Sequence, residues 1–564
     1  MAPKAFTIAS LAALILTVPG VAHPLAVANS TRVTEQKRVP EERFSSEGEW
    51  VGGFQIGKRL SYMRIQILTE PQGTTIRVLS AIPGGSGTIS GLRLEPPVVR
   101  FNLRSDADEL SFDGKLRGDT ISGTVGGVVN RGTFEFKRIA NVNPNLYDRY
   151  AGAYEFGRDR VVYIRRADRL KADPPSSVEK SWLYFVEESG RTGILWPSSE
   201  TAFFSGPSHL VPTPTELEVN FIPTDTAGVD RLMWHRKGRS QQIAKISKLY
   251  TEEDVTFHNG LTTLAGTLLL PATKGPHPAI ALIAGAGPSN RNQGYAIVAD
   301  IFARHGIAAL IYDKRGTGRS GGDWHVASFE DLADDALAGV DMLRRRKDIN
   351  AGQVGLWGIS EGGYVAPLAA SRAEHIAFLI LVSAGALPQA DAELRFIERS
   401  MRADGAGTHD IEEALGFSKL EREFAISGTG WESLAAAQTE VKDKKWFGYT
   451  WTGIFGATSS THWSWEWYRR RAAVEPETVL TKITCPVLAI WGGRDVYGGE
   501  GNKAAFEKAL RKGGNKSYAI RIFANGNHTL GLEEPGGDLY WKTYVPEYFE
   551  AMTGWLLRRV NLPK

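Results

Sequence analysis

The sequence predicts an α/β fold, in which a mostly parallel sheet is covered by helices, carries a helical cap insertion and follows an all-β N-terminal region. From about residue 250, continuous apolar runs alternate with helical stretches, which is typical of a parallel sheet buried on both faces. A Gly-x-Ser-x-Gly pentapeptide directly follows one of these runs. Between about residues 46 and 246, short alternating runs are separated by Gly, Pro and Asp turns, which predicts antiparallel β-structure.

The composition is that of a globular protein with more than one domain. The chain has 564 residues, of which 42% are hydrophobic and 23% are charged. The formal net charge of +3 is small for this length, so there is no reason to expect a nucleic-acid partner. Two short basic runs, 344–347 and 469–471, are interpreted as solvated helix faces.

The N-terminus has the pattern of a secretory signal peptide, predicted over residues 1–28 with cleavage near residue 22 or 28. Lys4 precedes an apolar run, 6–18, that is too short to span a bilayer. We therefore expect export to the periplasm or the medium, and we expect no stable membrane insertion. The single cysteine, Cys485, lies in an apolar run and is predicted to be a core residue.

The β-rich half divides into two stretches. Residues 44–140 are predicted to form a small β-barrel or sandwich that opens with the segment 48–54. Residues 145–246 form either a second β-rich domain or a continuation of the first, and their segment 152–156 echoes the earlier opening. Residues 44–140 contain no catalytic constellation, so a scaffold or interaction domain is the first interpretation of that stretch and a ligand-binding barrel the second.

Residues 250–564 carry the strand and helix alternation. A helix is predicted over 329–346, because apolar residues recur there on one face. About a hundred residues between two strands contain helical stretches and many aromatic residues, and a structureless loop of that length is implausible. We interpret about 387–480 as an inserted helical cap. Trp446, Trp451 and Trp463 are candidates for lining an acyl-binding pocket, and ordinary packing within the cap is the alternative.

Ser360 is the candidate nucleophile. It is the central residue of Gly358-Ile359-Ser360-Glu361-Gly362, which follows an apolar strand and precedes small residues that can begin a helix. This is the layout of a nucleophile elbow, in which a tight turn presents the serine hydroxyl above the sheet. A second match, centred on Ser320, lies in a glycine-rich loop several residues past its nearest strand, so the context favours Ser360.

A serine hydroxyl needs a base, and the base needs an orienting group. His528 follows the last predicted strand and Asp495 follows the strand before it, in the order serine, acid, histidine that this kind of sheet uses. We therefore predict His528 as the general base and Asp495 as the acid. The best alternative base is His325, and the alternative acids are Glu500 and Asp538.

The oxyanion hole requires two N–H donors. One is predicted to be the backbone N–H of Glu361, the residue after the nucleophile. The other should come from the loop 285–292, which follows an earlier strand. We predict the N–H of Ala286, with that of Gly287 as the second choice.

Five motifs in this order resemble the α/β-hydrolase superfamily. The similarity covers about residues 250–564 and points to bacterial serine esterases with a β-rich N-terminal region, near the prolyl-oligopeptidase-like and acyl-CoA thioester hydrolase branches. It implies Ser360, Asp495 and His528 as a catalytic triad and carboxylic ester hydrolysis as the activity. The chain departs from the family at the His-Gly oxyanion motif, where it has Ala284 in place of the histidine. The motifs are 285–292, 312–320, 358–362, 492–495 and 527–528.

The expected function is that of a serine carboxylesterase acting on short- to medium-chain acyl esters of small molecules, without a metal or organic cofactor. A serine peptidase or thioesterase of the same fold is the alternative, and Glu466 and Asp410 are candidate anchors for a peptide terminus. A third possibility is a binding protein whose function lies in the β-rich half, and the intact set of Ser360, Asp495 and His528 argues against it.

Overall fold

The computed structural model describes most of the chain from residue 46 onward. The predicted signal peptide, the alternative acid Asp538 and Asn292 of the predicted oxyanion loop lie outside the described residues. The described ranges are 46–56, 59–71, 73–82, 88–104, 109–127, 131–157, 160–167, 182–187, 191–207, 211–225, 228–247, 249–291, 295–497, 500–532 and 544–563.

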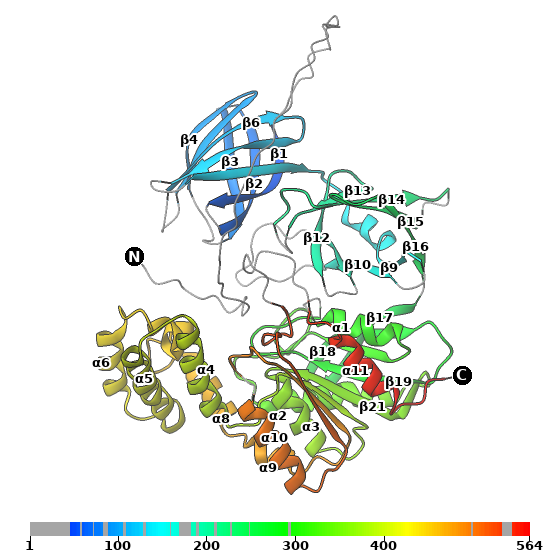
Figure 1. The fold of residues 1–564 in the computed structure, drawn as a ribbon, viewed down its shortest axis with the longest axis vertical. Coiled ribbons are helices and arrows are strands. Elements are labelled where there is room, and N and C mark those ends of the chain that lie inside the picture. The colour runs from blue at the N-terminus through cyan, green and yellow to red at the C-terminus, as the bar shows by residue number, and fades with distance from the viewer. Residues whose placement is uncertain are drawn as a thin grey trace, which may run out of the picture.

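The first unit is an antiparallel sheet of eight strands in the order β3-β2-β1-β8-β7-β6-β5-β4 (Figure 1). Alternate residues of its strands point inward and form an aromatic core that includes Phe101, Phe112, Phe134 and Phe136. Its strands are β1 (Gly48–Ile56), β2 (Arg59–Glu70), β3 (Gly73–Ile82), β4 (Thr88–Glu95), β5 (Val98–Arg104), β6 (Glu109–Arg117), β7 (Thr120–Gly126) and β8 (Arg131–Ile139).

The second unit is a closed antiparallel barrel in the order β10-β11-β12-β13-β14-β15-β16-β9. It begins after a 3₁₀ helix, Pro144–Arg149, and its sheet is separate from the first one. The strands are β9 (Gly152–Glu155), β10 (Val161–Ala167), β11 (Trp182–Glu187), β12 (Thr192–Pro197), β13 (Ala202–Ser205), β14 (Leu217–Pro223), β15 (Val229–Arg236) and β16 (Gln242–Ser247).

The third unit is an eight-stranded sheet in the order β17-β18-β20-β19-β21-β22-β23-β24. In this order, β17 and β18 are antiparallel to each other, and β18 is antiparallel to β20. The six strands from β20 to β24 run parallel to one another. The strands are β17 (Tyr250–Asn259), β18 (Thr262–Pro271), β19 (His277–Ile283), β20 (Ala308–Tyr312), β21 (Ile349–Ile359), β22 (Leu379–Val382), β23 (Val487–Gly492) and β24 (Tyr518–Phe523).

Helices cover both faces of this sheet, as the continuous apolar strands require. One face packs against α1 (Ala296–Arg304) and α11 (Tyr548–Leu557). The other packs against α2 (Phe329–Arg344), α3 (Gly362–Ser371) and α10 (Glu500–Lys512). The expected helix at 329–346 is α2, which begins at a capping box formed by Ser328 and Asp331.

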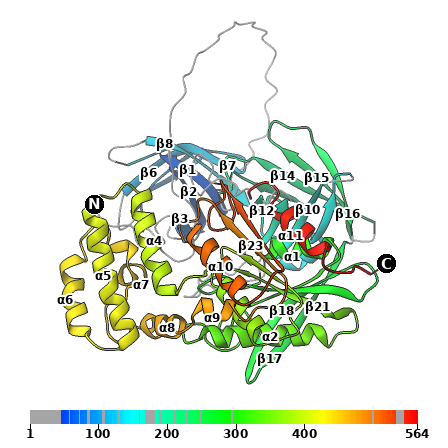
Figure 2. The same cartoon turned by 60° about the horizontal axis from the view of Figure 1, so that its bottom comes forward.

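The chain between β22 and β23 forms helices that gather beside the sheet (Figures 1 and 2). These helices are α4 (Gln389–Ala403), α5 (Thr408–Ser427), α6 (Trp431–Val441), a 3₁₀ turn (Phe447–Tyr449), α7 (Trp451–Phe455), α8 (Trp463–Ala472) and α9 (Pro476–Leu480). All of them except the last, α9, share an aromatic core of their own, whereas Leu480 of α9 packs in the core of the sheet. We refer to α4–α8 as the cap.

The barrel packs on the α1 and α11 side of the third unit. Tyr163 and Val186 of the barrel belong to the same apolar cluster as α1 and α11. At this contact the buried carboxylate of Asp300 binds Arg165 and accepts a 2.8 Å hydrogen bond from the Tyr250 hydroxyl. The second unit is thus joined to the third by apolar packing and a buried ion pair. In the described part of the chain, no helix is both long and apolar enough to cross a membrane.

Candidate active site

Four polar residues follow four neighbouring parallel strands. Ser360 comes after β21, Ser383 after β22, Asp495 after β23 and His528 after β24. Because the carboxyl ends of parallel strands meet at one edge of a sheet, these residues share the edge at which ligands bind in open α/β sheets.

Ser360 occupies a strained turn between β21 and α3. Its φ is +56°, which is uncommon for a residue with a side chain and is typical of a nucleophile elbow. The neighbouring backbone is packed too tightly for extra atoms, since a Cβ on Gly362 would lie 2.4 Å from the carbonyl oxygen of Ile283. A Cβ on Gly285 would lie 3.5 Å from the Cβ of Ser360, so the predicted oxyanion loop lies directly beside the serine.

Asp495 and His528 form a hydrogen-bonded pair. Asp495 Oδ1 lies 2.9 Å from His528 Nδ1 and also accepts a 2.9 Å bond from the N–H of Tyr497. Burial opposes ionisation of this carboxyl, but His528 and the N–H of Tyr497 outweigh it and hold the pKa of Asp495 below its usual range. A carboxylate can only accept, so Nδ1 of a neutral His528 carries the proton and Nε2 is left as a proton acceptor.

Backbone contacts bring His528 toward the elbow. The N–H of Ser360 donates to the carbonyl of Val382 over 3.0 Å, and Ser383, the next residue, donates its hydroxyl to the carbonyl of His528 over 2.7 Å. The Tyr497 ring packs against the His528 ring at 4.8 Å between centroids. The loop that carries the base is therefore tied to the strand next to the elbow.

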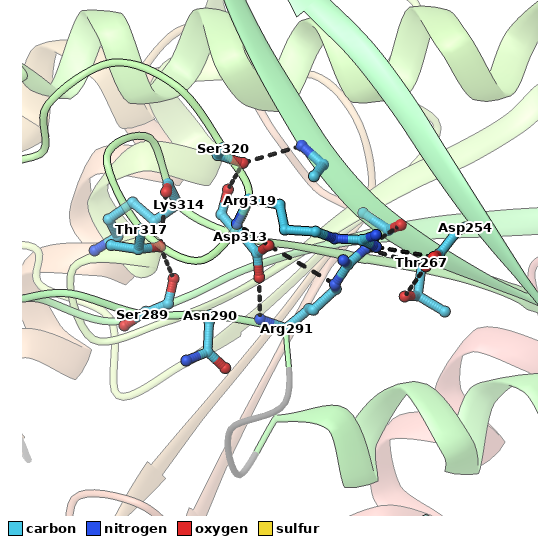
Figure 3. A network of polar contacts seen from close by, with 12 residues as sticks. Asp254, Thr267, Ser289, Asn290, Arg291, Asp313, Lys314, Thr317, Arg319 and Ser320 are labelled. Atoms are coloured by element: carbon cyan, nitrogen blue, oxygen red, sulfur yellow. Dashed lines mark hydrogen bonds and ion pairs between the residues drawn. The ribbon is translucent and has the colours of Figure 1, made fainter. Parts of the chain in front are cut away.

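The loop 312–320 holds the predicted oxyanion loop in place (Figure 3). The Asp313 carboxylate accepts from the N–H groups of Arg291, at 3.0 Å, and Arg319, at 2.9 Å. The Ser289 carbonyl accepts from the Thr317 hydroxyl, at 2.7 Å, and from the N–H of residue 314, at 2.9 Å. The loop that follows the neighbouring strand β20 thus sets the conformation of the oxyanion loop.

Ser320, the other pentapeptide serine, has a structural position in this network. Its hydroxyl donates to the carbonyl of Asp313 over 2.7 Å and accepts from the N–H of Ala265 over 3.0 Å (Figure 3). These bonds join the 312–320 loop to β18, so the hydroxyl of Ser320 is occupied by backbone partners.

A buried ionic cluster lies directly beneath the elbow. The Glu361 carboxylate accepts from Lys314 Nζ at 2.7 Å and from Arg471 Nε at 3.1 Å. Burial opposes ionisation of Glu361, but these two cations outweigh it and hold its pKa below the usual range. Burial lowers the pKa of Lys314, and Glu361 opposes that shift. The expectation of a solvated helix face at 469–471 is wrong for Arg471, which is 1% exposed because it turns inward from α8 to pair with Glu361.

The alternative site residues have other surroundings. His325 pairs with Asp323 at 2.8 Å and stacks on Trp324, so its ring is engaged within its own loop. Glu500 is the first residue of α10. Of the predicted peptide anchors, Asp410 is exposed on the cap, and Glu466 is bound by the neighbouring arginines of α8.

The three candidate pocket tryptophans belong to the aromatic packing of the cap. Trp446 is buried and its indole N–H donates to Glu413, while the indole N–H of Trp451 donates to Ser464 at 3.0 Å. Trp463 lies at the border of the cap, edge-on to Trp324. These contacts agree with the packing alternative, and a role in lining an acyl pocket stays a prediction.

One group of possible metal ligands occurs among the described residues. His409, Asp410 and Glu413 approach one another on the surface of the cap. Glu413 also binds Lys444 and the indole of Trp446, so it already has partners. The group is remote in sequence from the strand ends that carry Ser360 and His528, and exposed acidic groups of this kind are ordinary surface features.

Sequence reasoning did not single out the contacts made by Lys314, Ser383 and Arg471. Lys314 and Ser383 follow β20 and β22, so their positions after parallel strands were an available signal. Arg471 had no such signal, because it lies in a basic run on a helix and its partner is 110 residues away.

Comparison with known proteins agrees with this architecture. Residues 276–406 match the family described as serine aminopeptidase, S33. Esterase EstD of Thermotoga maritima is 24% identical over 291 residues, which are 50% of this chain and 60% of that protein. Polyketide transferase grgF of Penicillium sp. is 31% identical over 166 residues, which are 28% of this chain and 54% of that protein. The chain thus spans less than two thirds of the length of either relative.

Among solved structures, the esterase PF2001 of Pyrococcus furiosus aligns with 55% of this chain and 91% of its own, at 16% identity and a TM-score of 0.36. The sheet order, the elbow and the family match support the predicted fold class. The third unit therefore has the α/β-hydrolase fold, and it follows an all-β N-terminal region.

Proposed function

We propose that this protein is a serine carboxylesterase that cleaves short- to medium-chain acyl esters through an acyl-enzyme. The observation that carries the proposal is the Asp495–His528 hydrogen bond of 2.9 Å at the sheet edge where Ser360 occupies its strained turn. The name of the relative EstD supports ester substrates. Small-molecule esters are the proposed partners, and the reaction as proposed requires no cofactor.

The proposed reaction has two halves. His528 Nε2 takes the proton of Ser360 Oγ as the oxygen attacks the ester carbonyl, and the C=O electron pair moves onto the carbonyl oxygen. The N–H groups of Glu361 and Ala286 stabilise that oxyanion. Collapse expels the alcohol, which takes the proton from His528, and leaves an acyl group on Ser360. Water, deprotonated by His528, then attacks the acyl carbonyl. Collapse breaks the bond to Ser360 Oγ, which takes the proton back from His528, and the acid is released.

The test uses the full-length protein and its Ser360→Ala variant with chromogenic esters, acyl thioesters and aminoacyl anilides. We expect turnover of the simple esters, and a loss on the order of 10⁴-fold or more in the variant. A fluorophosphonate probe should label the wild type at Ser360, as mapped by mass spectrometry. Labelling at another serine, or unchanged turnover by the variant, would refute the assignment.

The family description favours a peptidase as the second candidate function. The same panel separates the two, because a peptidase would cleave the anilides and leave the simple esters largely intact. Thioester cleavage in preference to both would identify a thioesterase.

We also propose that the protein is exported, on the basis of the pattern in residues 1–28. Expression with the native N-terminus, followed by fractionation and N-terminal mass analysis, tests this. A mature chain beginning after residue 22 or 28 is expected, and a cytoplasmic chain that retains Met1 or begins at Ala2 would contradict it.

A further inference from the structure

Lys314 binds both segments that carry the predicted oxyanion donors. It is 5% exposed and donates to the carbonyl oxygens of Gly285 and Gly287, the latter at 3.0 Å, and to the carboxylate of Glu361 at 2.7 Å. An ammonium has three N–H donors, and these three acceptors match them. The side chain therefore joins the oxyanion loop to the first residue after the nucleophile.

The bond to Gly285 bears directly on the oxyanion hole. The carbonyl of Gly285 and the N–H of Ala286 belong to one peptide unit. In the described chain the cis peptide bonds all precede proline, so this unit is trans and its C=O and N–H point in opposite directions. When Lys314 holds the C=O on one side, the N–H of Ala286 is turned to the other side. A cation on the carbonyl also polarises the unit and strengthens the N–H as a donor.

The bond to Glu361 bears on the second donor. The N–H of Glu361 is the other predicted oxyanion group, and the side chain of the same residue binds Lys314 Nζ. Arg471 of α8 completes the arrangement, since it binds Glu361 and donates to the carbonyl of Ala327 at 2.8 Å. The carboxylate of the residue next to Ser360 thus faces two cations, Lys314 and Arg471.

We infer that Lys314 is the positioning residue of the oxyanion hole, which orients the Gly285–Ala286 peptide so that the N–H of Ala286 and the N–H of Glu361 serve the same oxygen. This inference rests on the proposed function. It also selects Ala286 over Gly287 as the second donor. Of the two carbonyls that Lys314 holds, that of Gly285 shares its peptide unit with the N–H of Ala286, whereas that of Gly287 shares its unit with Pro288, which has no N–H.

The test compares Lys314→Met with Arg315→Met. Methionine is unbranched and one atom shorter than lysine, so it keeps the apolar stem of Lys314 and removes the three donors. Arg315 is the next residue and is also buried in an ion pair, with Asp335 at 2.6 Å, but its bonds go to α2 and not to the oxyanion loop. A general effect of losing a buried cation should therefore appear in both variants, and an effect on the oxyanion hole only in the first.

Deleting one oxyanion donor costs about 10²- to 10³-fold in kcat. Misorienting a donor should lower kcat less than deleting it. We therefore expect Lys314→Met to lower kcat about 10- to 100-fold with KM within about threefold. The affinity for a trifluoromethyl ketone, whose adduct with Ser360 carries an oxyanion, should fall by the same factor as kcat/KM. The affinity for the matching methyl ketone should change little. In Arg315→Met the ratio of the two ketone affinities should stay at the wild-type value.

A Lys314→Met protein that is folded by circular dichroism and keeps the wild-type ratio of the two ketone affinities would overturn the inference. An equal loss of that ratio in Arg315→Met would also overturn it. If Lys314→Met does not fold, Lys314→Gln replaces it, with the same selective loss expected and the same outcomes against it. A wild-type protein that neither turns over esters nor is labelled at Ser360 would instead refute the proposed function.

Discussion

A side chain at Gly358 should lower both the stability of the protein and the reactivity of Ser360, as the geometry of the elbow shows. A Cβ built on Gly358 would lie 2.2 Å from the carbonyl oxygen of Gly362 and 3.2 Å from the Cβ of Ala366. Ordinary contact begins at 3.4 Å, so Gly358→Ala must move the start of α3 by about 1.2 Å relative to β21. The obstructing atom belongs to the backbone, so no change of side-chain rotamer can relieve the clash.

The expected cost follows from that displacement. Overpacking of this kind destabilises by about 1–3 kcal/mol, and a shift of about 1 Å at a reacting group costs on the order of 10²-fold in rate. We therefore expect Gly358→Ala to unfold several degrees below the wild type and to be labelled by a fluorophosphonate on the order of 10²-fold more slowly. The assays are differential scanning fluorimetry and the labelling rate at Ser360.

Gly416→Ala is the matched control. Gly416 lies in α5, and a Cβ there would meet nothing within 4 Å. Helix propensity favours alanine by up to about 1 kcal/mol, so this variant should be as stable as the wild type or more so, with an unchanged labelling rate. A Gly358→Ala protein with wild-type stability and labelling would refute the reasoning, because it would mean that the elbow is not packed as described.

Three further predictions follow from the same geometry. Asp495→Asn should fold but lose about 10³- to 10⁴-fold in kcat for esters, because an amide no longer fixes the Nδ1–H tautomer of His528; a loss below tenfold would contradict the assigned role. Ser320→Ala should cost about 1 kcal/mol of stability in chemical denaturation, because the N–H of Ala265 loses its acceptor. It should leave the labelling of Ser360 unchanged, and a loss of labelling would reopen the choice between the two serines. Burial raises the pKa of Glu421 in the cap from 4.5 to about 7. The folded state therefore binds more protons between these values, and stability should fall as pH rises through that window by up to ~1.4 kcal/mol per pH unit. Glu421→Gln should flatten the dependence of the melting temperature on pH between 5 and 7, and an unchanged slope would exclude Glu421 as its source.

The ionic cluster beneath the elbow also bears on how the cap relates to the catalytic domain. Arg471 is the point at which α8 reaches the residue next to the nucleophile. Phe396 of α4 stacks on Tyr497 at 4.1 Å, and Tyr497 packs against His528. The cap therefore contacts the neighbours of both Ser360 and His528, so the position of the cap is coupled to both ends of the proposed proton transfer.

The fold class could be predicted from the sequence for physical reasons that act locally. Strands such as β19 and β23 are buried on both faces, so they appear in the sequence as unbroken apolar runs. Helix α2 shows its buried face as a repeat of apolar residues and its start as a capping box. Parallel strands place their carboxyl ends at one edge, so the residues after each run could be grouped before any distance was known.

The tertiary structure decided what depends on contacts between distant segments. Local patterns do not distinguish one basic helix face from another, so only the folded chain distinguishes Arg471, buried against Glu361, from its exposed neighbour Arg470. Local patterns also could not show the indole partners of Trp446 and Trp451, which agree with packing inside the cap, and a role of these residues in an acyl pocket stays a prediction.

The sequence by itself determined that a β-rich region precedes an α/β region, and it determined the strand ends that carry Ser360, Asp495 and His528, because apolar periodicity and turn residues act over a few positions. The division of the β-rich region into two separate sheets was visible only in the folded chain. Only the tertiary structure decided that Lys314 lies against the Gly285 carbonyl and Glu361, 47 residues further on. That contact exists because adjacent strands of the sheet, not adjacent residues of the chain, bring the loops together.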